Sequence, residues 1–229
     1  MKKLILFLLP VLVLLSGCNR QNGVTYFGLE AGTVSAGVFT TDEGVEMTIV
    51  GNEGKFDVAT SRRVLVRYET HPILNPEHID IDVLSLLDAG IPTPVSVDAI
   101  PDDPDGSPLQ VSDAWFSAQY LNILATFNGK DPALHTFSAT YKATEKDVTF
   151  RLSHDSAEDS STGNALSCFL SIPVFDPIVS YESQAMASGI KQPWPVTVVL
   201  QWTSTTLEAG PLTVYERKGS YTPPVPVSD

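Results

Sequence analysis

The chain has 229 residues, of which 43% are hydrophobic and 18% are charged, and its formal net charge is −13. This length is enough for one large or two small domains, each with a buried core. Because nucleic acids and anionic membrane surfaces attract positive patches, the negative charge argues against a nucleic acid as partner and against electrostatic binding to a membrane.

The first residues form a secretion signal. Lys2 and Lys3 supply a positive start, and an apolar run follows from Leu4 to Leu15. That run is too short for a stable transmembrane helix, which needs about 20 apolar residues. A charged start, a short apolar core and small residues at the end are typical of a cleaved signal. Residues 1–17 are therefore predicted to be removed.

The signal ends in Leu15-Ser16-Gly17-Cys18, which matches the lipobox of bacterial lipoproteins. There the cysteine thiol takes a diacylglyceryl group and becomes the first residue of the mature chain. Two or three acyl chains hold a protein firmly, whereas one holds it only marginally. We therefore predict lipidation at Cys18 and a cell-envelope location in the outer membrane. The periplasmic side is favoured because residues 19–23 contain no acidic run. The alternative is an ordinary secretory signal with a chance cysteine.

Apolar and polar residues alternate in three segments of the first half of the mature chain. They are residues 45–49, 63–68 and 79–83. A period of two predicts strands with one buried face. The stretch from Gly32 to Gly37 also has a β-like pattern, and we expect a bulge or bend where glycine relieves crowding.

Prolines and acidic residues then interrupt the pattern between Ile91 and Leu109, and turn chemistry is densest around Asp102–Gly106. We place a linker at residues 100–106, between an N-terminal domain at 18–99 and a C-terminal domain at 107–221. A flexible tail is expected at 222–229.

Alternation resumes in the second half of the chain. It predicts strands over residues 121–127, 137–141, 148–152, 165–172, 196–202 and 212–215. A short helix fits only at 180–190. Short strands at intervals of roughly 10 to 20 residues predict an all-β protein built from barrels or sandwiches.

Three strings resemble the NigD-like lipoprotein family of Bacteroidetes. They are Arg63-Val-Leu-Val-Arg-Tyr68, Trp115-x-x-x-x-Tyr120-Leu-Asn-Ile123 and Val148-Thr-Phe-Arg-Leu-Ser-His154. The resemblance implies an N-terminal OB-like barrel followed by a C-terminal β-sandwich. One departure is Ile91-Pro-Thr-Pro94, which stands where the family often has Leu-Thr-Lys. The family is named after an operon linked to a bacteriocin, and its molecular role is unassigned.

Two polar clusters could hold a metal ion. The first contains His71, Glu77, His78, Asp80 and Asp82, but a loop followed by the solvent-facing side of a strand explains all five residues and is the preferred interpretation. The second spans 154–163, where three carboxylates precede a glycine but lack the spacing of a calcium loop. We expect a polar hairpin connection there, with weak calcium binding as the alternative. The sequence therefore predicts no metal-binding, cofactor-binding or catalytic residue.

The remaining reactive or aromatic side chains are interpreted as structural. Cys168 shares a strand face with Leu166 and Leu170, so a buried, inert thiol is expected rather than a nucleophile. Trp115, Phe116 and Tyr120 are expected to pack in a core rather than to form a sugar-binding platform. Trp194, between two prolines, is the better candidate for an exposed contact.

These patterns favour a lipid-anchored envelope protein that binds other proteins and is not an enzyme. Its expected partners are the membrane, through the lipid, and other envelope proteins. The alternatives are a hydrolase acting on glycan or peptide and a bacteriocin-associated, immunity-like lipoprotein. An enzyme should gather carboxylates or histidines in one pocket, whereas a binding module should expose an apolar patch.

Overall fold

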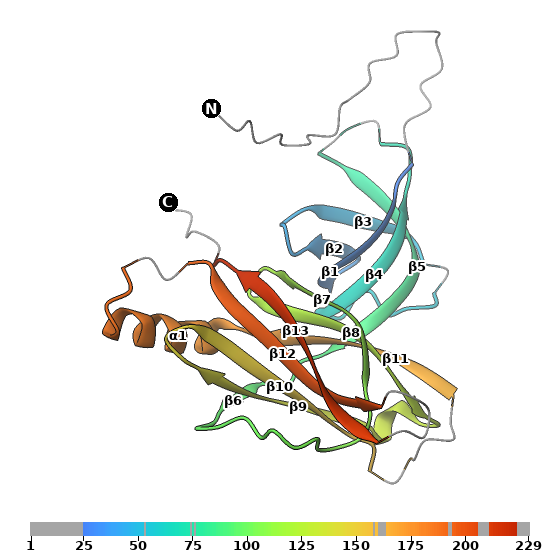
Figure 1. The fold of residues 1–229 in the computed structure, drawn as a ribbon. Coiled ribbons are helices and arrows are strands. Elements are labelled where there is room, and N and C mark those ends of the chain that lie inside the picture. The colour runs from blue at the N-terminus through green and yellow to red at the C-terminus, as the bar shows by residue number, and fades with distance from the viewer. Residues whose placement is uncertain are drawn as a thin grey trace, which may run out of the picture.

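A computed structural model describes residues 25–223, except 53, 74, 76, 158, 160–163, 192–193 and 206–210. The predicted signal segment, Cys18 and most of the predicted tail lie outside the described residues. Two β-rich units make up the described chain, with one α-helix and one short 3-10 helix (Figure 1).

The first unit is a closed five-stranded barrel. Its strands are β1 (Phe27–Ser35), β2 (Val38–Thr41), β3 (Glu46–Gly51), β4 (Arg62–Thr70) and β5 (Ile79–Gly90). β1 pairs with both β2 and β4 in antiparallel fashion, and parallel pairing of β3 with β5 closes the barrel. This is the topology of an OB fold. The interior holds a cluster that includes Val34, Phe39, Val64 and Ile81, all buried.

The second unit is a β-sandwich. One layer contains β7 (Gln110–Ser117), β8 (Tyr120–Gly129) and β11 (Asn164–Pro173). The other has the order β13-β12-β10-β9-β6, with β6 (Pro94–Ser96), β9 (Thr136–Ala143), β10 (Asp147–Asp155), β12 (Val196–Thr205) and β13 (Leu212–Tyr221). The short helix η1 (Pro132–Leu134) connects β8 to β9. Leu121, Ile123, Phe150, Leu152 and Leu200 are among the apolar side chains of the core between the layers.

The helix α1 (Phe175–Ala187) follows β11 and covers part of β9 and β10. Its buried side consists of Ile178, Tyr181 and Ala185, which recur at helical spacing. Pro177 is tolerated because the first turn of a helix has unpaired N–H groups. The sequence placed the helix at 180–190, and the structure places it several residues earlier.

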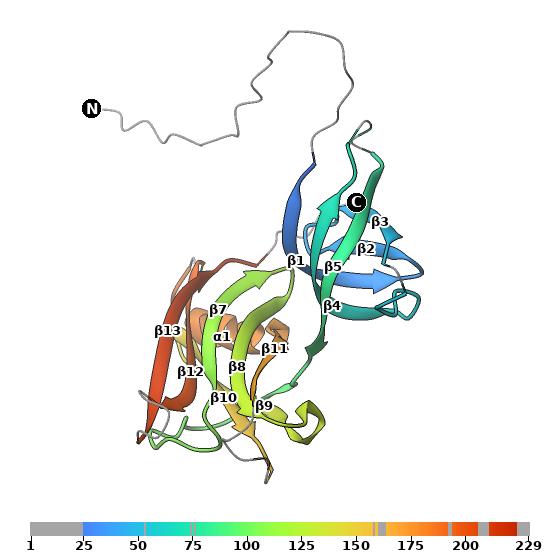
Figure 2. The same cartoon turned by 90° about the vertical axis from the view of Figure 1, so that its right-hand side faces the viewer.

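The units are joined through β5 and β11, which pair in parallel where Ala89 and Gly90 meet Phe169 and Leu170 (Figure 2). The barrel sheet and one sandwich layer therefore form a continuous sheet of eight strands. Ala31 and Leu65 of the barrel pack with Phe169 of the sandwich in a shared apolar cluster. Trp115 stacks on Phe169 with ring centroids 6.0 Å apart.

The prediction of an all-β fold with an N-terminal barrel and a C-terminal sandwich is confirmed. All strands predicted from alternation are present, and β13 is longer than expected. The division at 100–106 stays a prediction. However, β6 falls within the range assigned to the first domain, yet it pairs with β9 of the sandwich. Gly32 relieves crowding as expected, because a Cβ there would lie 2.2 Å from the Thr40 carbonyl oxygen.

Candidate functional site

A buried polar network crosses the junction of the two units. Arg63, on β4, donates from Nη1 and Nη2 to the two carboxylate oxygens of Asp42 at 2.7 Å each. Its Nε donates to Ser171 Oγ at 2.8 Å, and Nη2 also donates to Asn122 Oδ1 at 3.0 Å. The guanidinium carbon lies 3.9 Å from the centroid of the Tyr120 ring, which suits a cation–π contact.

The junction network is closed on itself. Ser171 donates to Asn122 at 2.7 Å, and Asn122 donates to Ser117, which in turn donates to Asp42. Burial alone would raise the pKa of the Asp42 carboxyl, but the hydrogen bonds from Arg63 and Ser117 and the charge of Arg63 outweigh it and leave the pKa lowered. Since these groups already serve one another, the network positions the two units rather than binding a ligand.

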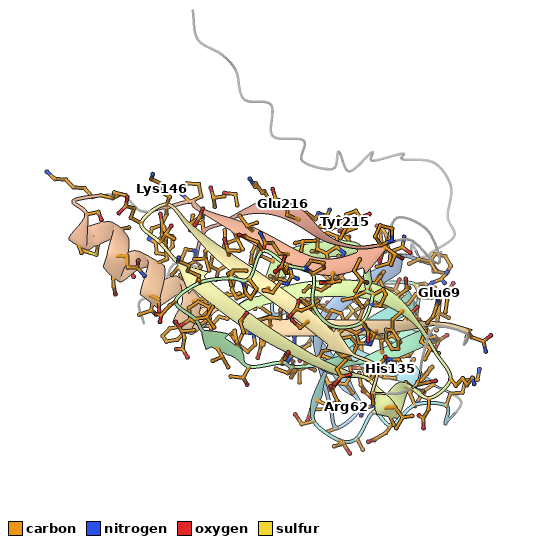
Figure 3. The ribbon with its side chains drawn as sticks, turned by 60° about the horizontal axis from the view of Figure 1, so that its bottom comes forward. Arg62, Glu69, His135, Lys146, Tyr215 and Glu216 are labelled. Carbon is orange, nitrogen blue, oxygen red and sulfur yellow. The ribbon has the colours of Figure 1, made fainter. Side chains whose placement is uncertain are left out.

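A second buried cluster lies at the end of the sandwich beside η1, where Figure 3 labels His135. His154 Nδ1 lies 3.2 Å from the Pro108 carbonyl oxygen, and His154 Nε2 lies 2.8 Å from His135 Nδ1. His135 Nε2 is 3.3 Å from Asp159 Oδ2. Gly129 makes room for this arrangement, because a Cβ there would lie 2.4 Å from His135 Nε2.

The directions of the hydrogen bonds in the histidine cluster follow from the groups that can only accept. The Pro108 carbonyl can only accept, so His154 donates from Nδ1 and accepts at Nε2 from His135. His135 Nε2 faces the Asp159 carboxylate, which can only accept. Burial, and the charge on His135, lower the pKa of His154 despite the hydrogen bond to Pro108. The cluster is therefore a satisfied internal chain of hydrogen bonds.

Asp159 anchors the loop between β8 and β9. Its Oδ2 accepts from the backbone N–H groups of Lys130 at 2.6 Å and Asp131 at 2.8 Å, in addition to His135. The N–H groups of Asp131 and Lys130 hold the pKa of the Asp159 carboxyl below its usual range. Because three donors converge on this oxygen, the carboxylate acts as a structural anion here. This favours the plain polar connection over the calcium loop, although residues 158 and 160–163 lie outside the described part.

Arg151 fixes the proline-rich segment that the sequence assigned to a linker. Its side chain is buried on β10, and Nη2 donates to Asp105 Oδ1 at 2.7 Å and to Thr203 Oγ1 at 2.9 Å. The Asp103 carbonyl oxygen also accepts from Nη2, at 3.2 Å. This arginine was not singled out from the sequence. Asp105 therefore belongs to a segment docked on the sandwich.

The first predicted metal cluster separates into two pairs. His71 Nε2 lies 3.0 Å from Asp82 Oδ1, and His78 Nε2 lies 3.1 Å from Asp80 Oδ1. Across residues 25–223, apart from the undescribed positions, no three His, Cys, Asp or Glu side chains are grouped closely enough to hold a metal ion. The structure thus does not bring these five predicted residues to one point.

The remaining predicted residues lie mostly in packed surroundings. Cys168 is a half-buried free thiol, and burial raises its pKa to about 12, which agrees with an inert thiol. Phe116 packs on Tyr221, with ring centroids 4.8 Å apart. Trp115 and Phe116 on β7 pack against apolar clusters as expected, whereas Tyr120 on β8 stacks on the Arg63 guanidinium and not in an apolar core. Trp194 packs on Tyr181 and is half-buried, so the expectation of an exposed contact there is wrong.

Helix α1 also carries apolar side chains that are exposed to solvent. Phe175 and Met186 are each 62% exposed and Val179 is 44% exposed. At 100° per residue these three side chains lie within about 40° of one another around the helix, on a side next to the buried one. We call them the α1 stripe. Asp176 and Glu182 lie beside the stripe and give it an acidic border.

A small cavity lies between β7, β8, β12 and β13. Its volume is about 40 Å³, and Phe116, Leu121 and Leu200 are among its lining residues. Pockets for small molecules usually measure about 300–1,000 Å³. This cavity therefore does not suit a substrate. No helix in the described part of the chain is long and apolar enough to cross a bilayer.

Several solved structures resemble this chain. A NigD-like immunity protein from Bacteroides caccae matches with a TM-score of 0.61 and 20% identity over 87% of this chain and 97% of its own. The chain has the fold of that NigD-like protein. A protein of unknown function from Bacteroides vulgatus matches with a TM-score of 0.56 and 14% identity, over 88% of this chain and 92% of its own.

A candidate lipoprotein from Bacteroides fragilis also has a TM-score of 0.56, with 13% identity over 84% of this chain and 96% of its own. None of these three proteins is described as an enzyme. Neither a family model nor a curated protein matches the sequence. The NigD-like resemblance is thus confirmed at the level of the fold.

Proposed function

We propose that this chain is a lipid-anchored envelope protein that binds another envelope protein through the α1 stripe. The observation that carries the proposal is the exposure of Phe175, Val179 and Met186 on one side of a helix whose neighbouring side is buried. Exposed apolar side chains grouped on one surface mark interaction sites. The acidic border favours a partner whose apolar surface is rimmed by Lys or Arg, since complementary charge steers association.

The buried polar clusters support binding rather than catalysis. The junction network and the histidine cluster both use their polar atoms internally, and no residue of either cluster lines the cavity between the sandwich layers. A catalytic pair must instead reach a reacting group on a substrate. Coupling of barrel and sandwich through the β5–β11 pairing and the junction network would hold α1 at a fixed position relative to the barrel.

Photo-crosslinking in the native envelope tests this proposal. A photoreactive phenylalanine analogue at Phe175 or at Met186 should capture the same partner, identified by mass spectrometry and then reconstituted from purified components. The same analogue at Val50, an exposed apolar position on β3, is the matched control and should capture none of it. Met186→Asp should weaken the reconstituted complex. Equal capture from Val50, or unchanged binding by Met186→Asp, would contradict the assignment of α1.

A further inference from the structure

We propose that the outer face of the barrel at the start of β1 rests on the lipid bilayer that carries the Cys18 anchor. In this arrangement Phe27 and Leu29 enter the boundary between headgroups and acyl chains, and Arg67 lies at the level of the phosphates. The inference deepens the proposed function, because it rests on the lipid anchor and adds a second contact with the same membrane.

The patch is formed by side chains that share one face of the barrel. Phe27 is 69% exposed and Leu29 is 57% exposed, and their spacing of two residues on β1 places them on the same side. Across the ladder, Leu29 lies opposite Arg67, whose side chain is exposed. Leu84, 44% exposed, stands at the irregularity where β5 pairs with β4. These four residues are the β1 patch.

The β1 patch continues an apolar surface that is covered elsewhere. Ala31 follows Leu29 on the same face of β1, and it is buried with Leu65 and Phe169 in the cluster between the units. The sandwich covers one end of this barrel face, and the other end, at Phe27, is left open. Figure 2 shows that open end of β1 at the side of the barrel away from the sandwich.

The distance along the chain brings the patch close to the anchor. Cys18 precedes Tyr26 by eight residues. A fully extended chain spans at most about 3.5 Å per residue, so Tyr26 stays within about 28 Å of the lipidated residue. Tethering at this range raises the effective concentration of the patch at the bilayer surface. By contrast, α1 lies on the other unit, far from the start of β1 (Figure 1).

The side chains of the patch match a zwitterionic bilayer surface. Large apolar residues with an arginine among them suit an interface, because the guanidinium reaches the phosphates while its stem stays in apolar surroundings. Glu69 lies opposite Phe27, and the whole chain is acidic. Attraction to anionic lipid is therefore not the driving force, and apolar burial next to the tether is.

A partition measurement on the mature chain, residues 18–229, tests the inference. A single tetradecyl chain is attached to the Cys18 thiol with an alkyl maleimide. Cys168 does not compete, because burial raises its pKa to about 12. One acyl chain gives only marginal membrane binding, so a contribution from the protein surface is measurable. Partition into phosphatidylcholine vesicles is then read by flotation.

The double variant Phe27→Ser/Leu29→Ser should partition about tenfold more weakly than the unchanged chain, since two large apolar side chains no longer leave water. The matched control is Val95→Ser/Leu134→Ser on β6 and η1 of the sandwich, which also replaces two exposed apolar side chains and should partition like the unchanged chain. Circular dichroism checks that both variants keep the fold.

Equal partition of the unchanged chain and the β1 variant would overturn the inference. An equal loss in the sandwich control variant would also overturn it, because the contact would then be unspecific adsorption. The chemical attachment makes the result independent of whether cells lipidate Cys18. Failure of the membrane contact is therefore distinguishable from failure of the lipid anchor or of partner binding by α1.

Discussion

Replacing Arg63 by Met should destabilise the protein and loosen the joint between its two units. The side chains of Arg63 and Asp42 are 6% and 8% exposed, so the variant leaves a carboxylate buried without its cation. Removing one partner of a buried ion pair costs about 3–5 kcal/mol of unfolding free energy. For a chain of this size, a loss of that order lowers the melting temperature by on the order of 10 °C.

Urea unfolding followed by two probes measures this effect. Tryptophan fluorescence reports mainly on the sandwich, where Trp115, Trp194 and Trp202 lie, and far-UV circular dichroism reports on both units. The two transitions should coincide in the unchanged protein. They should separate in Arg63→Met, because the barrel loses a buried tie to Asn122 and Ser171.

The double variant Arg63→Met/Asp42→Leu is the control for charge burial. Replacing a buried ion pair with apolar side chains is often nearly neutral, so the double variant should be more stable than Arg63→Met alone. A loss below about 1 kcal/mol for Arg63→Met would refute the reasoning, since such a value is typical of an exposed pair. So would a double variant whose losses simply add.

Three further predictions concern the sandwich and the linker. The free energy of unfolding should fall as the pH drops below about 6.5, because the pKa of His154 is lowered in the folded state and protonation then favours the unfolded chain. Urea unfolding midpoints at pH 7.5 and pH 5.5 measure this effect. The two midpoints should differ less in His154→Gln than in the exposed control His78→Gln. Limited proteolysis should cut first between residues 91 and 109, as the exposed prolines and turns predict. Gel filtration should nevertheless find the two fragments associated, and their separation would show that the β5–β11 pairing and the junction network are weak. Thermal melts in chelator and in millimolar calcium should coincide, and Asp159→Asn should have a lower melting temperature in both. A melting temperature that rises with calcium, and no longer does so in Asp159→Asn, would instead support the calcium loop.

Most strands could be predicted because their alternation is local. The segment around Val64, Val66 and Tyr68 shows a period of two that survives as β4. β1 was harder to recognise because glycine and glutamate occupy inner positions of the strand at Gly28 and Glu30. β6 has only three residues and includes a proline, which is unfavourable in central strands.

The buried clusters could not be predicted because their partners are distant in sequence. Arg63 belongs to an alternating strand and is expected on its solvent-facing side. In the structure, however, the sandwich covers that side. Its partners Asn122 and Ser171 are 59 and 108 positions away. His154 was grouped with the acidic residues that follow it, whereas its neighbour in space is His135. Spacing along the chain carries no signal for either contact.

Both proposals depend on the lipid anchor. Mass spectrometry of the N-terminal peptide, from protein purified out of its native envelope, tests that anchor. The account predicts that the peptide begins at Cys18, carries a diacylglyceryl thioether and lacks residues 1–17. Cys18→Ser should keep those residues and lose the lipid mass. A free Cys18 thiol in the native protein, or a membrane-extracted chain that still contains residues 1–17, would contradict the account.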